Sequence, residues 1–151
     1  VEIVFIDKLW YINLHKSIRF DLNELTKFKT GISKNNINQF LSLVENGGLL
    51  NDLDYPLLDN YKSSTNSIIL DALLSALSMP FIIKDEKLYF KLAETIFKYD
   101  PLNEEALRVH INSLNKQAKS AQAKMLYDDF SRKYQEQMAE EFHVSYKSLT
   151  N

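Results

Sequence analysis

The stretch DPLNEEALR, which begins at Asp100, is the clearest helix start in the chain, and the residues on both sides of it follow a helical pattern. Asp100 can cap a helix with its carboxylate, and Pro101 suits the first helical position, where its missing N–H would be unpaired in any case. Glu104 and Glu105 meet the positive end of the helix dipole. A helix starting at Pro101 is therefore predicted, with core-facing Leu107, Ile111 and Leu114.

Neighbouring stretches predict further helices. One is expected over residues 85–99, and a longer one over residues 120–139 after a short turn. Pro80 helps to end a helix that is apolar nearly all round, so that helix should lie in the middle of the bundle. Two helices are predicted upstream: residues 21–28, capped by Asp21 and ended by Gly31, and residues 37–44, followed by Gly47. A helical turn or two should then start at Pro56. A further helix should run from a cap at Ser64 or Thr65 to Ser78.

The three helices between residues 85 and 139 share a pattern: an alanine where two helices cross, a large residue nearby, and a proline at a turn. Small residues let helices approach closely, and short connections make neighbouring helices antiparallel. The pattern is similar to tetratricopeptide-type repeats. The predicted fold class is mainly α, a tetratricopeptide-like antiparallel helix-pair bundle with a short N-terminal β-hairpin.

The hairpin is predicted from VEIVFIDKLWYINL, residues 1–14, where two runs of β-branched and aromatic residues flank Asp7 and Lys8. Two strands alone are marginally stable, so the hairpin should pack on something. It is either an appendage of the helices or the last piece of a neighbouring domain, and we favour the second. Because the chain opens on Val1 directly in strand-like sequence, we expect it to be part of a longer polypeptide.

Composition limits the possible functions. The chain has 151 residues, no cysteine and a formal net charge of -2 with dispersed Lys and Arg. Disulfides and thiolate metal sites are therefore ruled out, and a strong electrostatic footprint for nucleic acid is missing. The longest apolar run, residues 67–83, is interrupted by Asp71, serines and Pro80, so no membrane span is predicted. No secretory signal is visible, and we expect a cytoplasmic location.

Residues that could carry chemistry are scattered. His15, His110 and His143 show no metal-ligand spacing, and no HExxH, Gly-x-Ser-x-Gly, GxGxxG or GxxxxGK[ST] motif is present. Adjacent acids such as Asp128 and Asp129 point about 100° apart on a helix, which suits an exposed face better than acid–base catalysis. We therefore predict no enzyme activity, no metal and no cofactor.

Two sets of residues allow a binding role beside a structural one. Tyr127, Phe130 and Tyr134 could stack on bases, although the same helical stripe is more often core. A set of basic residues could touch phosphate from one end of the bundle, although their acidic neighbours argue against that as a main role. These residues are Lys116, Lys119, Lys124, Arg132 and Lys133. Asp129–Lys133 and Arg132–Glu136 are spaced as i, i+4 ion pairs.

Residues 92–142 resemble the bacterial transcriptional activator domain, the helical module of SARP-type regulators. The shared pattern is an alanine-bearing helix, Asp-Pro-Leu-x-Glu, Ala-Leu, a short turn, then Ala-x3-Tyr with a second aromatic three residues later. One departure is Ala118, where the family usually has glycine. The residues that carry the resemblance, taken here as structural signature residues, are Asp100, Pro101, Glu104, Ala106, Leu107, Ala123, Tyr127, Phe130 and Tyr134.

Upstream, GGLL (Gly47 to Leu50) resembles the Gly-x-Leu-Leu connection of the same module. WYINL (Trp10 to Leu14) is similar to the end of the hairpin wing that closes a winged helix-turn-helix DNA-binding domain. The resemblance thus implies a wing remnant over residues 1–16 and an activator domain over residues 17–151.

The function that the resemblance implies is regulatory: protein contact with a second copy, the transcription machinery or another regulator. DNA would be bound by the parent protein through a recognition helix upstream of Val1, so the DNA-binding residues of this chain are unknown. The alternative is a free-standing tetratricopeptide-like scaffold that binds a peptide in its groove.

Overall fold

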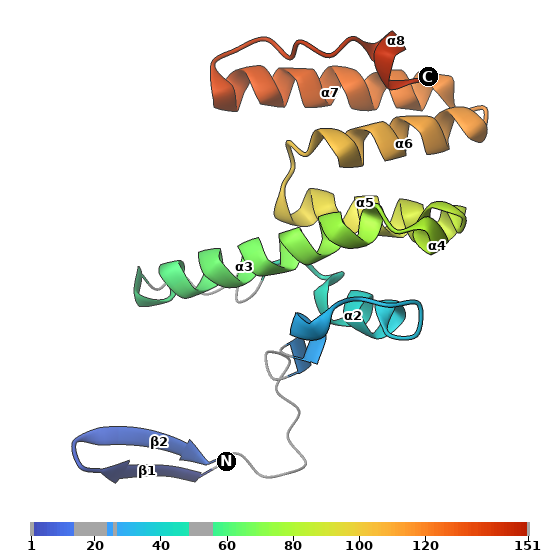
Figure 1. Cartoon of the computed structure of the whole chain (residues 1–151). Coiled ribbons are helices and arrows are strands. Elements are labelled where there is room, and N and C mark those ends of the chain that lie inside the picture. Colours follow the sequence, from blue (N-terminus) through green and yellow to red (C-terminus); the bar gives the residue numbers. More distant parts are fainter. Residues whose placement is uncertain (1, 14–23, 26, 49–55, 151) are drawn as a thin grey trace. The chain divides into compact units, whose positions relative to one another are not determined.

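The structure, a computed structural model, describes residues 2–13, 24–25, 27–48 and 56–150. The chain divides into two compact units, Val1–Gly31 and Ile32–Asn151. The described residues are mainly helical, which confirms the predicted fold class (Figure 1).

The first unit contains the predicted hairpin. Strand β1 (Glu2–Ile6) pairs antiparallel with β2 (Leu9–Asn13). The two residues between them, Asp7 and Lys8, both have positive φ, at 52° and 65°. Two successive left-handed residues form the type I′ turn, whose twist matches that of the flanking strands, so the strands pair without a bulge.

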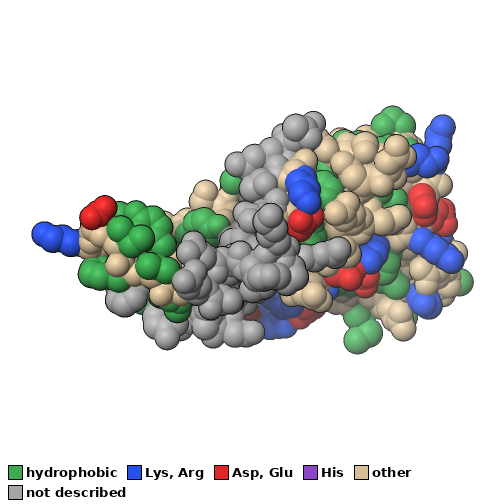
Figure 2. All heavy atoms as spheres, turned by 90° about the horizontal axis from the view of Figure 1, so that it is seen from below, with side chains coloured by type: hydrophobic (Ala, Val, Ile, Leu, Met, Phe, Trp, Pro, Cys, Tyr) green, Lys and Arg blue, Asp and Glu red, His purple; other side chains and the backbone are tan. Residues whose placement is uncertain are grey.

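Both faces of this hairpin carry apolar side chains. Directly paired residues share a face and successive residues alternate, so Ile3 and Phe5 lie on one face while Ile6 and Leu9 lie on the other. All four are more than half exposed, and Figure 2 shows the hydrophobic side chains gathered on the hairpin at the left of the view. An exposed two-stranded sheet that is apolar on both faces needs a further partner to be stable.

Elsewhere in this unit a 3₁₀ helix, η1 (Lys27–Thr30), precedes Gly31, which has a φ of 116°. The predicted cap at Asp21 lies outside the described residues.

The second unit is a stack of helices. The successive helices α5 (Glu86–Tyr99), α6 (Glu104–Lys116) and α7 (Ser120–Met138) run antiparallel, and each contacts the next (Figure 1). On the other side of α5 lie α2 (Ile37–Val44), α3 (Pro56–Leu77) and α4 (Pro80–Ile83), and a last short helix, α8 (Tyr146–Leu149), contacts α6.

Small residues let the stacked helices approach. Ala93 of α5, Ala106 of α6 and Ala123 of α7 are all fully buried. Leu107 and Phe130 form one apolar cluster with Ile111 and Ala123, as expected for facing stripes of adjacent helices. The buried residues of α2 are Ile37, Phe40, Leu41 and Val44.

Two features of α3 differ from the sequence prediction. The helix starting at Pro56 and the helix capped by Ser64 or Thr65 are one continuous helix of 22 residues. No glycine or proline follows Pro56 before Pro80, so nothing breaks the backbone hydrogen-bond ladder, and serines can lie on its exposed side. The helix is also not buried on all sides, as a helix in the middle of the bundle would be, because Ile68 is 55% exposed.

The start of α6 was also predicted wrongly. The helix begins at Glu104, not at Pro101, and its N-cap is Asn103, whose side chain accepts a hydrogen bond from the Ala106 N–H at 3.1 Å. Asp100 is instead the C-cap residue of α5, and its carboxylate accepts bonds from the Leu102 N–H and the Asn103 amide. Asp100 and Pro101 therefore shape the turn that leads to the cap.

Candidate functional site

A groove between α5 and α7 is the candidate site. Phe97 near the end of α5, Pro101 in the following turn, and Leu126 and Phe130 of α7 line a cavity of about 220 Å³. The rings of Phe97 and Phe130 lie 6.4 Å apart at their centroids. Although α6 packs between α5 and α7, the Phe97 and Phe130 side chains reach each other from the two outer helices, and with Pro101 and Leu126 they form an apolar floor.

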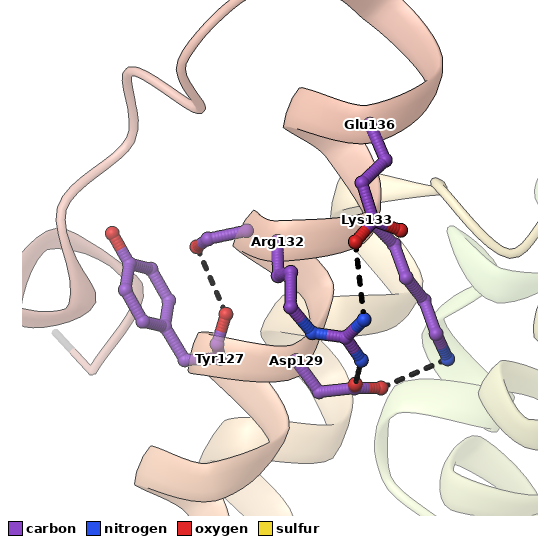
Figure 3. Close-up of polar contacts among 6 residues, drawn as sticks. Tyr127, Asp129, Arg132, Lys133 and Glu136 are labelled. Carbon is purple, nitrogen blue, oxygen red and sulfur yellow. Dashed lines mark hydrogen bonds and ion pairs between the residues drawn. The ribbon is translucent and has the colours of Figure 1, made fainter.

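The rim of the groove is charged. Asp129 and Lys133 also line the cavity, and the Lys133 ammonium lies 2.8 Å from the Asp129 carboxylate. Arg132 pairs with Asp129 and, at 3.2 Å, with Glu136, so the four side chains form a ladder along α7 (Figure 3). These contacts confirm both predicted i, i+4 pairs. Hydrogen bonds from Lys133 and then Arg132 lower the pKa of Asp129, which keeps that carboxylate ionised.

The signature residues are mostly structural. Leu107, Ala123 and Phe130 belong to one buried cluster of α6 and α7, and Ala106 of α6 is also fully buried. Glu104 occupies the first turn of α6, where its charge favours the helix dipole. Pro101 and Phe130 alone among the nine signature residues line the groove.

Tyr127, Phe130 and Tyr134 do lie along one side of α7, but their rings pack within the protein. The Phe142 ring lies 4.9 Å from Phe130, 5.2 Å from Tyr134 and 6.1 Å from Tyr127. The Tyr127 hydroxyl donates a hydrogen bond to the Val144 carbonyl at 2.9 Å. This arrangement favours the core interpretation over a base-stacking platform.

The basic residues named in the sequence do not form a free cationic surface. Four of the five pair with carboxylates: Lys116 with Glu86, Lys124 with Asp128, and Arg132 and Lys133 with Asp129. The fifth, Lys119, donates a hydrogen bond to the Gln117 side chain. The acidic partners leave little unbalanced charge for phosphate.

The two described histidines lie on different elements, His110 in α6 and His143 after α7. His110 stacks on Phe90 at 4.5 Å and meets Phe97 edge-on at 5.0 Å, and its Nε2 is buried without a hydrogen-bond partner among the described residues. Burial lowers the pKa of His110 to about 4. His143 is exposed, and His15 lies outside the described residues. Within the described ranges, no three His, Asp or Glu side chains gather as a metal site would require.

Sequence reasoning missed the residues after α7. Phe142, Tyr146 and Leu149 all pack on the α6–α7 pair, and Leu149 is only 1% exposed. The available signal was weak: Ser145 caps α8 by accepting a bond from the Ser148 N–H, but a four-residue helix has no measurable period. Among the helices that the structure describes, none has the length and apolar character needed to cross a bilayer.

Comparison of the chain with protein-family models, with curated proteins and with solved structures finds no match. The resemblance of residues 92–142 to the activator domain therefore stays a prediction that rests on the residues quoted for it.

Proposed function

We propose that this chain is the regulatory, protein-interacting module of a bacterial transcriptional regulator. It would contribute dimerisation or contact with the transcription machinery, while DNA recognition would belong to another part of the parent protein. The transcriptional role rests on the resemblance of residues 92–142, and the mode of action rests on the groove.

The groove between α5 and α7 is the observation that carries the protein-contact role. Its floor of Phe97, Leu126 and Phe130 is large enough to receive an apolar side chain, and the Asp129–Lys133 pair beside it offers a donor and an acceptor for polar groups of a partner. Such a site, apolar at its centre and polar at its rim, suits a protein segment.

The hairpin supports the same proposal from the other unit. Ile3, Phe5, Ile6 and Leu9 give it two apolar faces, as a wing would have if it packed with further strands of a DNA-binding domain. The formal net charge of -2 fits a module that does not itself hold DNA.

The test is a transcription reporter. The chain is fused to a DNA-binding domain whose operator lies upstream of a bacterial promoter, and reporter output is compared with that of the DNA-binding domain alone. We expect the fusion to change output, and Leu126→Asp and Lys133→Glu to remove the change. Met125→Asp is the matched control, because Met125 is 71% exposed on α7 and does not line the groove.

A peptide-binding scaffold without a transcriptional role would behave differently. Its fusion would leave the reporter unchanged while the purified chain still captured peptides in a manner sensitive to Leu126→Asp. That pair of results would replace the proposal with the scaffold alternative.

A further inference from the structure

The residues after α7 fold back as a strap, defined here as residues 140–150. In Figure 1 this segment runs back along α7 and ends in α8. Leu149 inserts into the cluster formed by Leu107, Ile111, Ala123 and Phe130. The Phe142 ring meets three aromatic rings of α7, and Tyr146 meets Tyr127 edge-on at 5.6 Å.

The strap is held by packing more than by polar bonds. Its side-chain hydrogen bonds to the helices are Tyr127 to the Val144 carbonyl and Tyr146 to the Asn115 amide oxygen at 3.4 Å. Lys124 lies over the Tyr127 and Tyr146 rings, at 4.8 and 5.5 Å. Within the part of the chain that the structure describes, no ion pair joins the strap to α6 or α7.

The connection to α7 is a single left-handed residue. Ala139 has φ 57° and ψ 23°, a conformation that residues other than glycine seldom adopt. If Ala139 changed to helical angles, α7 would extend and the strap would leave its seat. The hydrogen-bond ladder of α7 itself would not have to break, so the opening is local.

An opened strap would uncover the apolar side of α6 and α7, including Leu107, Ile111 and the Tyr127 and Phe130 rings. The terminal face of a helix stack needs a capping segment, and here the strap covers that face. The segment shown to fit this face is the strap itself, and a second copy of the chain carries an identical strap.

We propose that the strap is exchanged between two copies of this chain, each strap seating its Phe142, Tyr146 and Leu149 on α6 and α7 of the other. The exchange covers the apolar α6–α7 face of both copies at once, because the contact is self-complementary and leaves no face open in a two-fold dimer. The exchanged contact lies on α6 and α7, whereas α3 packs on α5. The proposal does not depend on the proposed transcriptional role.

Energy transfer between labelled chains tests the exchange. The chain has no cysteine, so single-cysteine variants label cleanly. Lys147→Cys places a donor on the strap, and Gln117→Cys places an acceptor at the end of α6; both positions are exposed. We expect energy transfer to appear after the two labelled populations are mixed, together with a dimer in light scattering whose fraction rises with concentration. Leu149→Asp in the donor chain should abolish the transfer, and Met125→Asp should leave it.

A second variant keeps the test independent of Leu149. Deleting Glu140 and Glu141 shortens the connection between α7 and the strap, so the strap reaches α6 and α7 of its own chain poorly. The deletion should therefore shift the chain from monomer to dimer. Circular dichroism establishes that each variant is folded. Absence of transfer between folded chains, or a folded deletion variant that stays monomeric, would overturn the proposal.

Discussion

The hydroxyl of Tyr99, at the end of α5, lies 2.8 Å from the carbonyl oxygen of Gly47, beyond the end of α2. It also lies 3.0 Å from the Val44 carbonyl oxygen, which accepts the Gly47 N–H as well, so the single hydroxyl proton is shared between two carbonyls near the end of α2. Burial raises the pKa of Tyr99 to about 12, so the hydroxyl keeps its proton and remains a donor. Gly47, with φ 96°, turns the chain so that its carbonyl faces this hydroxyl.

Tyr99→Phe is expected to destabilise the second unit by about 1 kcal/mol, because the Gly47 carbonyl loses this donor and the Val44 carbonyl keeps only the Gly47 N–H. Urea unfolding followed by circular dichroism measures the change. Tyr61→Phe on α3 is the control, since Tyr61 is 47% exposed, and it should leave the midpoint unchanged. Equal midpoints for Tyr99→Phe and wild type would show that the hydroxyl contributes nothing to the α2–α5 contact.

His110 is expected to make stability depend on pH. Its pKa is about 4 in the folded chain against an ordinary 6.5, so the unfolded chain binds the proton more tightly. Stability should therefore fall as pH drops from about 6.5 toward 4, by roughly 2 kcal/mol for this partly exposed ring.

The measurement is urea unfolding at several pH values in that window, compared between wild type and two variants. His110→Phe removes the titrating ring between Phe90 and Phe97 and should flatten the pH dependence. His143→Gln, at an exposed histidine, should keep the wild-type slope. An unchanged slope in His110→Phe would contradict the assignment.

Ala118→Gly is expected to stabilise the chain by about 1 kcal/mol. Ala118 has φ 57° in the turn between α6 and α7, where glycine has no side-chain penalty. Thermal unfolding should show a higher midpoint. Ala121→Gly, at the exposed second residue of α7, should not raise the midpoint, because alanine already suits its helical backbone. A lower midpoint for Ala118→Gly would refute the strain argument.

Leu107→Asp and Phe130→Asp should each unfold the second unit. Both side chains are buried in one cluster, and a buried carboxylate without a partner there costs about 4 kcal/mol or more. Circular dichroism and thermal unfolding give the readout, and the exposed Met125→Asp serves as the control. A wild-type melting temperature in either buried variant would reject the α6–α7 packing.

The chain alone should bind duplex DNA weakly and without sequence preference. Its formal net charge is -2, and Lys116, Lys124 and Lys133 are paired with carboxylates. Fluorescence anisotropy at physiological salt checks this expectation. Tight binding to one sequence over a scrambled duplex would contradict it.

Local signals were read correctly where one short segment contains the whole interaction. The helices predicted over residues 37–44 and 85–99 form as α2 and α5. Asp7 and Lys8 form the hairpin turn for the same reason. The role of Asp100 could not be predicted in this way, because its carboxylate has several hydrogen-bond donors nearby. In the folded chain it accepts hydrogen bonds from Leu102 and Asn103 in the turn between α5 and α6.

By itself the sequence determined the helical class, the hairpin and the bounds of α2, α5 and α7 to within a residue, since periodicity and turn residues act within a few positions. Tertiary structure alone decided that the rings of α7 face Phe142, that Tyr99 joins α5 to α2, and that α8 exists at all. These features depend on contacts between residues 8 to 55 positions apart, and a four-residue helix is stable only when packing outweighs the cost of nucleating it.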